Sequence, residues 1–131
     1  MAFARWLFRI AGAYGLIAIV PLYFAADKYM PVVGTPALRT GFVFYYGFLS
    51  VALAWQFAFL VIGHDPLRFR SLMLIAVIEK LGFFVPITAL YFLGSAREDL
   101  LAAGIIDGFL GVLFIVAWYR LRATSATAAL G

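Results

Sequence analysis

The sequence contains no cysteine and only one histidine, His64. The absence of cysteine excludes a disulfide bond, a thiolate metal site, an iron–sulfur cluster and a cysteine nucleophile. A single histidine excludes haem ligation by two histidines of one chain and disfavours a dedicated zinc site. The sequence also has no Ser-His-Asp arrangement, no glycine-rich phosphate loop and no metal-ligand spacing. We therefore expect no metal site and no catalytic residues of these types.

Charged residues are also scarce. They make up 12% of the 131 residues, whereas 66% are hydrophobic, and the mean hydropathy is +1.06. A soluble domain has about 25% charged and about 45–50% apolar residues, so this composition favours a protein that lies in a lipid bilayer. The net charge of +4 does not indicate nucleic-acid binding, because the basic residues flank apolar stretches instead of gathering on one polar face.

Four apolar stretches predict four transmembrane helices in one domain. A helix needs about 20 apolar residues to cross the hydrocarbon core, and suitable stretches cover residues 4–25, 41–62, 66–93 and 100–120. The first stretch is similar to a secretory signal, but no small-x-small cleavage site follows it, so we interpret it as the first membrane helix. The domain is expected to cover residues 1–122, and residues 123–131 are expected to form a flexible tail.

Local signals predict where these helices bend or begin. Pro21 and Pro86 each remove a backbone donor and should bend the first and third helices. Asp65 followed by Pro66 is typical of an N-cap and a first helical position, which predicts that the third helix begins there. The segment 27–40 contains two prolines, Pro31 and Pro36, and Gly34, so we expect an irregular loop between the first two helices.

The distribution of lysine and arginine predicts the orientation. With the N-terminus in the cytoplasm, six basic residues lie on the cytoplasmic side, namely Arg5, Arg9, Arg68, Arg70, Arg120 and Arg122. Three lie on the outer side, namely Lys28, Arg39 and Arg97. This excess satisfies the positive-inside rule for short loops. We therefore expect both termini to lie in the cytoplasm.

Four ionisable residues lie inside the predicted spans: Arg9, Glu79, Lys80 and Asp107. Ionisable groups in hydrocarbon are costly unless they face protein or water, so these residues should meet inside the bundle. Depths estimated from a rise of about 1.5 Å per residue pair Arg9 with Glu79 and Lys80 with Asp107. Because neighbouring residues of a helix point about 100° apart, we expect two separate pairs on two sides of the third helix.

Other polar residues are candidates to complete this network. Gln56 is the only amide side chain of the chain and needs a hydrogen-bonding partner inside a membrane. Its estimated depth is close to that of Glu79, and Tyr14 and Ser50 lie near the midplane. His64 is interpreted as a loop residue at the cytoplasmic interface, with a proton relay to the bundle as the alternative.

Small residues mark two faces where helices should approach each other closely. In the fourth helix, Asp107 is surrounded by Gly104, Gly108 and Gly111, so we expect Asp107 to face the bundle. In the second helix, small residues recur at a spacing of three and four and predict a packing seam formed by Gly47, Ser50, Ala54 and Ala58.

Two features each allow two interpretations. Tyr45 and Tyr46, with the phenylalanines around them, either line a site for a flat lipophilic ligand such as a quinone or form a plain aromatic belt. The charged residues either fix only the register of the helices, although buried pairs are poor stabilisers, or form a functional site. In a functional site, Glu79 and Asp107 would carry protons, an ion or the polar head of a ligand.

An arginine early in the first helix, in the run Leu7-Phe8-Arg9-Ile10-Ala11-Gly12, is followed by Glu79 in the third helix and by a fourth helix rich in small residues. In this layout the chain resembles the DoxX-like group of small bacterial four-helix membrane proteins. Some members of that group are associated with quinone-linked oxidoreductases. The small multidrug transporters are similar in size and helix number, but their essential acid lies in the first helix, where this sequence has Arg9 and no carboxylate.

These patterns predict an all-α four-helix transmembrane bundle in a bacterial inner membrane. We expect the protein to bind a lipophilic small ligand, such as a lipid or a quinone, or to serve as an accessory subunit of a membrane complex, without enzymatic activity. Its partners would be the bilayer and either a second copy in a homodimer or a larger complex. The alternatives are a proton-coupled small-molecule transporter that uses Glu79 and Asp107, and a membrane-embedded enzyme of isomerase type.

Overall fold

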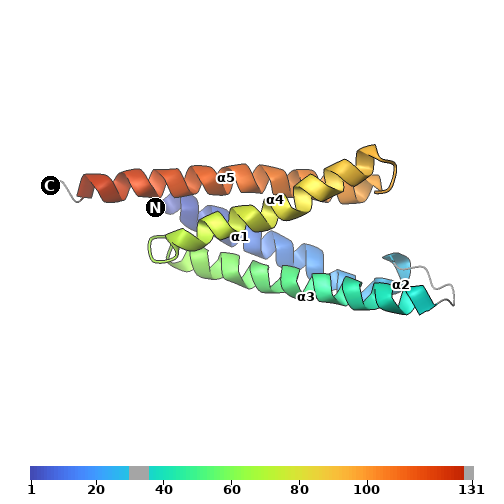
Figure 1. Ribbon diagram of the computed structural model, residues 1–131. Helices are drawn as coiled ribbons and strands as arrows, with labels where there is room; N and C mark the ends of the chain where they lie inside the picture. Colours follow the sequence, from blue (N-terminus) through green and yellow to red (C-terminus); the bar gives the residue numbers. More distant parts are fainter. Residues whose placement is uncertain (30–35, 129–131) are drawn as a thin grey trace.

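The computed structural model describes residues 1–29 and 36–128. In chain order its elements are α1 (Ala2–Ile19), the 3₁₀ helix η1 (Val20–Phe24), α2 (Ala26–Tyr29), α3 (Pro36–His64), α4 (Arg70–Phe92) and α5 (Glu98–Ala128) (Figure 1). No strand occurs in these residues. The predicted all-α class is therefore confirmed for the described part of the chain.

Four helical segments match the four predicted apolar stretches. They are Ala2–Phe24, Gly41–His64, Arg70–Phe92 and Glu98–Arg122, and each is long and apolar enough to cross a membrane. Large apolar side chains on the outside of the bundle, such as Ile17, Phe44 and Phe92, are mostly exposed. The outer surface is therefore as apolar as the composition predicts.

The first span changes from an α-helix to a 3₁₀ helix before its end. Pro21 lies at the start of η1, directly after α1. Proline has no N–H to donate to the preceding turn, and short 3₁₀ segments are frequent at helix ends. Pro21 thus lies where the span changes from α-helix to 3₁₀ helix in its last turns, and the predicted bend stays a prediction. Pro86 lies inside α4 and does not end that helix.

The helices around the first loop and at the C-terminal end differ from the predicted ones. The segment expected to be an irregular loop contains α2 and the start of α3, because Pro36 occupies the first helical position, where its missing N–H is harmless. Residues 30–35 of that segment lie outside the described residues. α5 continues through Ala128, so it extends beyond residue 120 into the predicted tail; residues 129–131 are again outside the described part.

The start of α4 is also corrected by the structure. The helix begins at Arg70 and not at Pro66. A carboxylate oxygen of Asp65 accepts a hydrogen bond from the backbone N–H of Arg68 at 3.2 Å, and its backbone oxygen accepts one from Phe69 at 3.2 Å. Asp65 therefore caps a turn that precedes the helix, because its side chain satisfies a donor of that turn.

The turn between α4 and α5 depends on one glycine. Gly94 has a φ of +71°, a left-handed conformation that glycine adopts without a steric penalty. Its N–H donates to the oxygen of Tyr91 at 2.9 Å, and the N–H of Ser95 donates to the oxygen of Leu90 at 2.8 Å. This pair of bonds is a Schellman motif, which ends α4 and allows the chain to reverse into α5.

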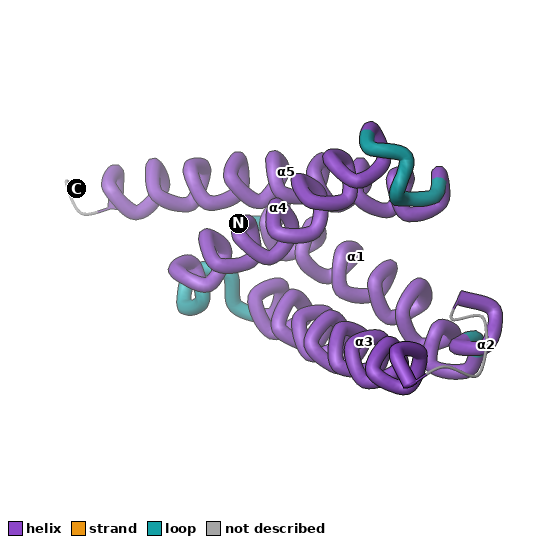
Figure 2. The backbone as a smooth tube through the Cα atoms, turned by 45° about the vertical axis from the view of Figure 1, so that its right-hand side comes forward, coloured by secondary structure: helices purple, strands orange, loops and turns teal. Residues whose placement is uncertain are grey.

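The four long helices form two antiparallel pairs, α1 with α3 and α4 with α5 (Figures 1 and 2). Glycines allow both approaches. A Cβ at Gly12 of α1 would lie 2.8 Å from the backbone oxygen of Gln56, and a Cβ at Gly108 of α5 would lie 2.9 Å from the ring of Phe84. The missing side chains therefore let the helices of each pair come close together.

The small-residue seam predicted for α3 is wrong for packing within the chain. A Cβ at Gly47 would meet nothing within 4 Å, and Ala54 is exposed. α3 buries a neighbouring face instead, which carries Ala52, Gln56 and Phe59. Small residues permit a close approach but do not cause one, and here the approach occurs where Gly12 of α1 leaves room.

The two pairs meet at one end of the bundle, which contains the N-terminus and the turn between α3 and α4. Phe8 of α1 stacks on Phe114 of α5 with ring centroids 4.1 Å apart, and Phe59 of α3 contacts Phe114 at 5.3 Å. The other buried members of this core are Ala4, Ala11, Ile62, Met73, Ala76, Val77, Ala117 and Leu121. We call this the closed end.

At the opposite end the pairs separate. Figures 1 and 2 show α4 and α5 diverging from α1 and α3 toward η1 on one side and the Gly94 turn on the other. One contact between the two sides there is made by the guanidinium of Arg97, which lies 5.8 Å from the ring centroid of Tyr29. We call this the open end. The bundle is therefore V-shaped, with its aromatic core at the closed end.

Candidate functional site

Lys80 lies at the point where the two helix pairs begin to separate. It is on α4, and only 6% of its side chain is exposed. Its ammonium nitrogen lies 5.1 Å from the ring centroid of Phe59, so it contacts the aromatic core on the side that faces the open end. Attraction to the ring face compensates part of the cost of removing an ammonium group from water. Lys80 thus lies directly against the aromatic core.

Asp107 of α5 is the strongest partner of Lys80. The lysine nitrogen donates a hydrogen bond to a carboxylate oxygen of Asp107 at 2.9 Å. The approach of the helices is set by glycines on both sides of Asp107: a Cβ at Gly104 would lie 3.3 Å from Ile87, and one at Gly111 would lie 3.5 Å from the Cβ of Lys80. The predicted Lys80–Asp107 pair is confirmed, and so is the role of these glycines around it.

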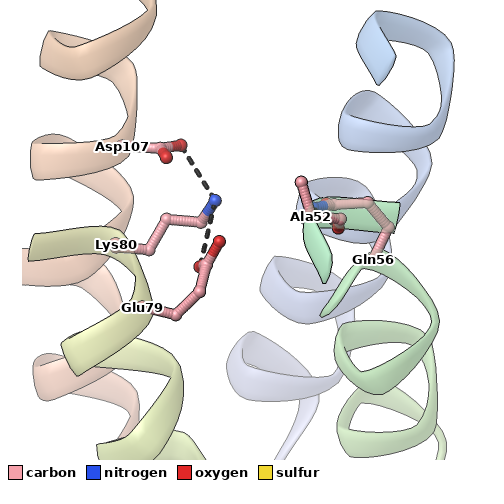
Figure 3. Close-up of polar contacts among 5 residues, drawn as sticks. All are labelled: Ala52, Gln56, Glu79, Lys80 and Asp107. Carbon is pink, nitrogen blue, oxygen red and sulfur yellow. Dashed lines mark hydrogen bonds and ion pairs between the residues drawn. The ribbon is translucent and has the colours of Figure 1, made fainter. Parts of the chain in front are cut away.

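Glu79 contacts the same lysine. One of its carboxylate oxygens, Oε2, lies 3.3 Å from the Lys80 nitrogen, which is an ion-pair contact (Figure 3). This oxygen is buried, yet it has no hydrogen-bond partner in the described part of the chain. The side chains of Glu79 and Asp107 are each 17% exposed. Two carboxylates therefore share one ammonium group, and we call these three residues the charged triad.

The predicted Arg9–Glu79 pair is wrong. The guanidinium carbon of Arg9 lies 6.0 Å from the ring centroid of Trp6, and its stem packs against Gly63 near the end of α3. Arg9 therefore belongs to a shallow surface hollow between α1 and α3, which His64 also lines. Glu79 pairs with its own neighbour because the flexible stem of a lysine can bring the ammonium group back across the 100° between adjacent side chains.

Gln56 is buried next to the charged triad but bonds to its own helix. Its side-chain nitrogen donates to the backbone oxygen of Ala52 at 2.9 Å, and only 3% of the residue is exposed (Figure 3). Its amide oxygen is directed at Gly15 of α1, where a Cβ would overlap with it. The expected partner is thus a carbonyl of the preceding turn, and no hydrogen bond joins Gln56 to the triad in the described residues.

The tyrosines and Ser50 have different positions. Tyr14 lies on the side of α1 that faces the triad. The hydroxyl of Tyr45 donates to the backbone oxygen of Leu22 at 2.8 Å and fastens η1 to α3. Ser50 donates to the backbone oxygen of Tyr46 at 2.8 Å. Ser50 also accepts a hydrogen bond from the Tyr23 hydroxyl of η1 at 3.3 Å, and the ring centroids of Tyr46 and Tyr23 lie 6.0 Å apart. Ser50, Tyr45 and Tyr46 therefore connect α3 to η1, and in the described residues none of them makes a hydrogen bond to Glu79, Lys80 or Asp107.

A partly open cavity of about 200 Å³ lies between the two helix pairs. The charged triad and Gln56 form its polar wall. Apolar side chains from all four long helices and η1 form the rest, and Phe48 of α3 and Phe83 of α4 stack there with ring centroids 5.8 Å apart. The remaining lining residues are Ala11, Tyr14, Gly15, Ala18, Ile19, Leu22, Ala52, Leu100, Ala103 and Leu110. The site therefore has the form of an apolar chamber with a charged inner end.

Sequence reasoning missed most of this apolar lining. Phe83, Ala103 and Leu100 carry no chemical signal, and their proximity depends on how far the helix pairs separate. The sequence did carry one signal, which is helical spacing. Phe83 lies four residues after Glu79, and Ala76 lies three residues before it, so both share a helix face with Glu79. No group of three or more potential metal ligands occurs in the residues that the structure describes.

The chain matches no protein-family model, no curated protein and no solved structure. The resemblance to the DoxX-like group therefore stays a prediction.

Proposed function

We propose that this chain is a multi-pass membrane protein that binds a lipophilic small ligand in the cavity between its two helix pairs. The observation that carries the proposal is the combination of a charged triad and an apolar chamber in one partly open space. Ligand sites are typically apolar clefts with a few polar groups that fix orientation, and sites between the helices of a bundle are common.

The membrane setting is supported by the four apolar helices and by the exposed aliphatic and aromatic side chains on their outer faces. The N-terminus, the α3–α4 turn and α5's last residues lie at the closed end, which also carries Arg5, Arg68, Arg70 and Arg122. The positive-inside rule supports a cytoplasmic position for the closed end, and in that orientation the cavity would open toward the outer half of the bilayer.

A purely structural role for the triad explains less of the site. A register-setting ion pair needs one acid and one base, and buried pairs are poor stabilisers when compared with apolar packing. This site has a second carboxylate and leaves unfilled space beside it. A ligand that fills the apolar chamber and meets the polar end would account for both features.

A cavity-filling substitution tests the proposal. Ala103→Phe places a large ring in the cavity, whereas Val112→Phe adds the same ring on an exposed part of the same helix. Native mass spectrometry of the protein, extracted gently from its own membrane, should detect a retained lipophilic molecule in the wild type and in Val112→Phe but not in Ala103→Phe. Equal retention by both folded variants would contradict the proposal.

A proton-coupled transporter is the second candidate function. It is supported by two carboxylates that compete for one lysine, since a proton and a substrate can then exchange at the same place. Transport also needs access from the closed end, where Phe8, Phe59 and Phe114 now block the way. In proteoliposomes, Glu79→Gln should then abolish substrate-driven proton flux while the protein stays folded; an absence of flux in the wild type with every bound ligand would exclude this candidate.

A further inference from the structure

The charges that face the cavity do not cancel. Among the described residues that line it, Glu79, Asp107 and Lys80 are charged, and the other polar side chains are the neutral Gln56 and Tyr14. In their ionised forms the three charged groups sum to one net negative charge. Arg9, which would have supplied the missing positive charge, lies in a different hollow at the closed end.

The negative charge is concentrated at Glu79. Lys80 makes its shorter contact, a hydrogen bond of 2.9 Å, with Asp107 and its longer contact, 3.3 Å, with Glu79. The buried oxygen of Glu79 accepts no hydrogen bond from the described residues. A buried carboxylate that is only partly compensated is unfavourable, so the Glu79 carboxyl group needs either a proton or a further cation at its exposed part.

The space beside Glu79 suits a small apolar body. A cavity of about 150 Å³ accommodates benzene in another protein, so the volume of about 200 Å³ here holds one ring or a short alkyl chain. The stacked rings of Phe48 and Phe83 line the cavity. The open side lets a longer tail leave between the helix pairs into the proposed membrane.

We propose that the cavity selects lipophilic cations, in which an amine or another basic head pairs with Glu79 and an apolar body lies against Phe48 and Phe83. This inference rests on the proposed function and names the class of ligand. A protonated amine would pair with the exposed part of the Glu79 carboxylate, whose side chain is 17% exposed, and would bring the net charge of the site to zero. Aromatic faces next to a cation add further attraction.

Three probes with the same apolar body test the inference: phenylbutylamine, phenylbutanol and phenylbutyrate. Their binding to the full chain is measured by equilibrium dialysis in nanodiscs of phosphatidylcholine, a lipid with no net charge, with empty nanodiscs as the correction for partitioning. Because a hydrogen bond between charged groups is stronger than one between neutral groups, we expect the amine to bind about tenfold to hundredfold more tightly than the alcohol. The carboxylate should bind most weakly.

A matched pair of variants assigns the preference to Glu79. Glu79→Gln removes the charge and keeps the shape, so it should reduce the affinity for the amine to about that of the alcohol, while the alcohol itself binds as before. Glu98→Gln removes a negative charge at the start of α5, outside the cavity lining, and should change neither affinity.

The outcomes separate the two proposals. Equal binding of amine and alcohol to the wild type would overturn the cation preference and keep the proposed function; the extra carboxylate would then be neutralised by a proton. A lack of saturable binding for all three probes, with the protein folded by circular dichroism, would overturn both. The wild-type comparison decides the matter even if Glu79→Gln fails to fold.

Discussion

The closed and open ends of the bundle are built from the same four helices but from different kinds of side chain. At the closed end, large rings and aliphatic side chains from every helix interlock, as Phe8 and Phe114 do with centroids 4.1 Å apart. At the open end, Phe24, Phe92 and Leu93 point outward, and the pairs are joined by a cation–π contact between Arg97 and Tyr29. The charged triad lies at the boundary between the two regions.

The contrast between the packed closed end and the separated open end explains how one bundle can combine stability with an accessible site. In hydrocarbon, apolar helices gain little by leaving lipid for each other, so association depends on close packing and polar contacts. The closed end supplies the packing. Because the aromatic core lies at the closed end, the two helix pairs can separate beyond it and leave a cavity.

Removing a central ring should weaken the closed end most. Phe114→Ala leaves a cavity between Phe8 and Phe59, and large-to-small changes of this kind cost about 3–5 kcal/mol. Phe109→Ala, at a position of α5 that is 62% exposed, is the matched control and should change the free energy of unfolding by less than about 0.5 kcal/mol. Reversible unfolding in mixed micelles, followed by circular dichroism, measures both.

Removing Lys80 should have the next largest effect. Lys80→Met keeps the apolar stem but leaves two buried carboxylates without their cation, and breaking a buried pair in this way costs about 3 kcal/mol. The triple variant Glu79→Gln, Lys80→Met, Asp107→Asn removes every charge and should recover most of the loss in the same unfolding assay. A triple variant as unstable as Lys80→Met would show that the site depends on shape and not on charge balance.

A single added methyl group should distinguish the two parts of the α1–α3 pair. Gly12→Ala would push a Cβ against the backbone of Gln56, which cannot move independently, and should cost about 2 kcal/mol. Gly47→Ala meets nothing within 4 Å and should stabilise the helix slightly through the higher helix propensity of alanine. Opposite signs are expected in thermal unfolding; a loss of stability in both would indicate that the Gly47 face packs against another molecule.

The smallest effect is expected at the open end. Arg97→Gln removes the contact with Tyr29 and the exposed ion pair with Asp99. Exposed contacts of these two kinds contribute about 1 kcal/mol or less, so the free energy of unfolding should change little. If the open end moves independently of the core, hydrogen exchange near Gly94 should become faster in this variant while exchange around Phe114 stays the same.

The Lys80–Asp107 contact could be predicted because two independent signals agree on it. The rise per residue of a helix relates position in the sequence to depth, and the glycines around Asp107 mark a face that a neighbouring helix can approach closely. The prediction of an Arg9–Glu79 pair depended on estimated depth alone. Depth does not say toward which neighbour a side chain points, and Arg9 points toward the end of α3.

The helix ends and the seam of α3 show the same limit. Asp65 and Pro66 form a sound N-cap signal, yet the chain uses it for a turn, since it has to reverse between α3 and α4 before the next helix begins. The small residues of α3 could in principle pack against any neighbour. Gly12 and Gly15 of α1 both lie against Gln56, so Gln56, and not Gly47, lies at the contact with α1.

The all-α class, the four long apolar helices and the need of the ionisable residues for partners follow from the sequence without the fold, because they depend on local composition and on the cost of burying charge. Tertiary structure alone decided that the pairs separate at one end, that two carboxylates share Lys80, and that an apolar chamber forms beside them. These features depend on the rotation of each helix about its axis and on the angle between the pairs. Both are set by contacts between residues far apart in the chain, and no local pattern encodes them.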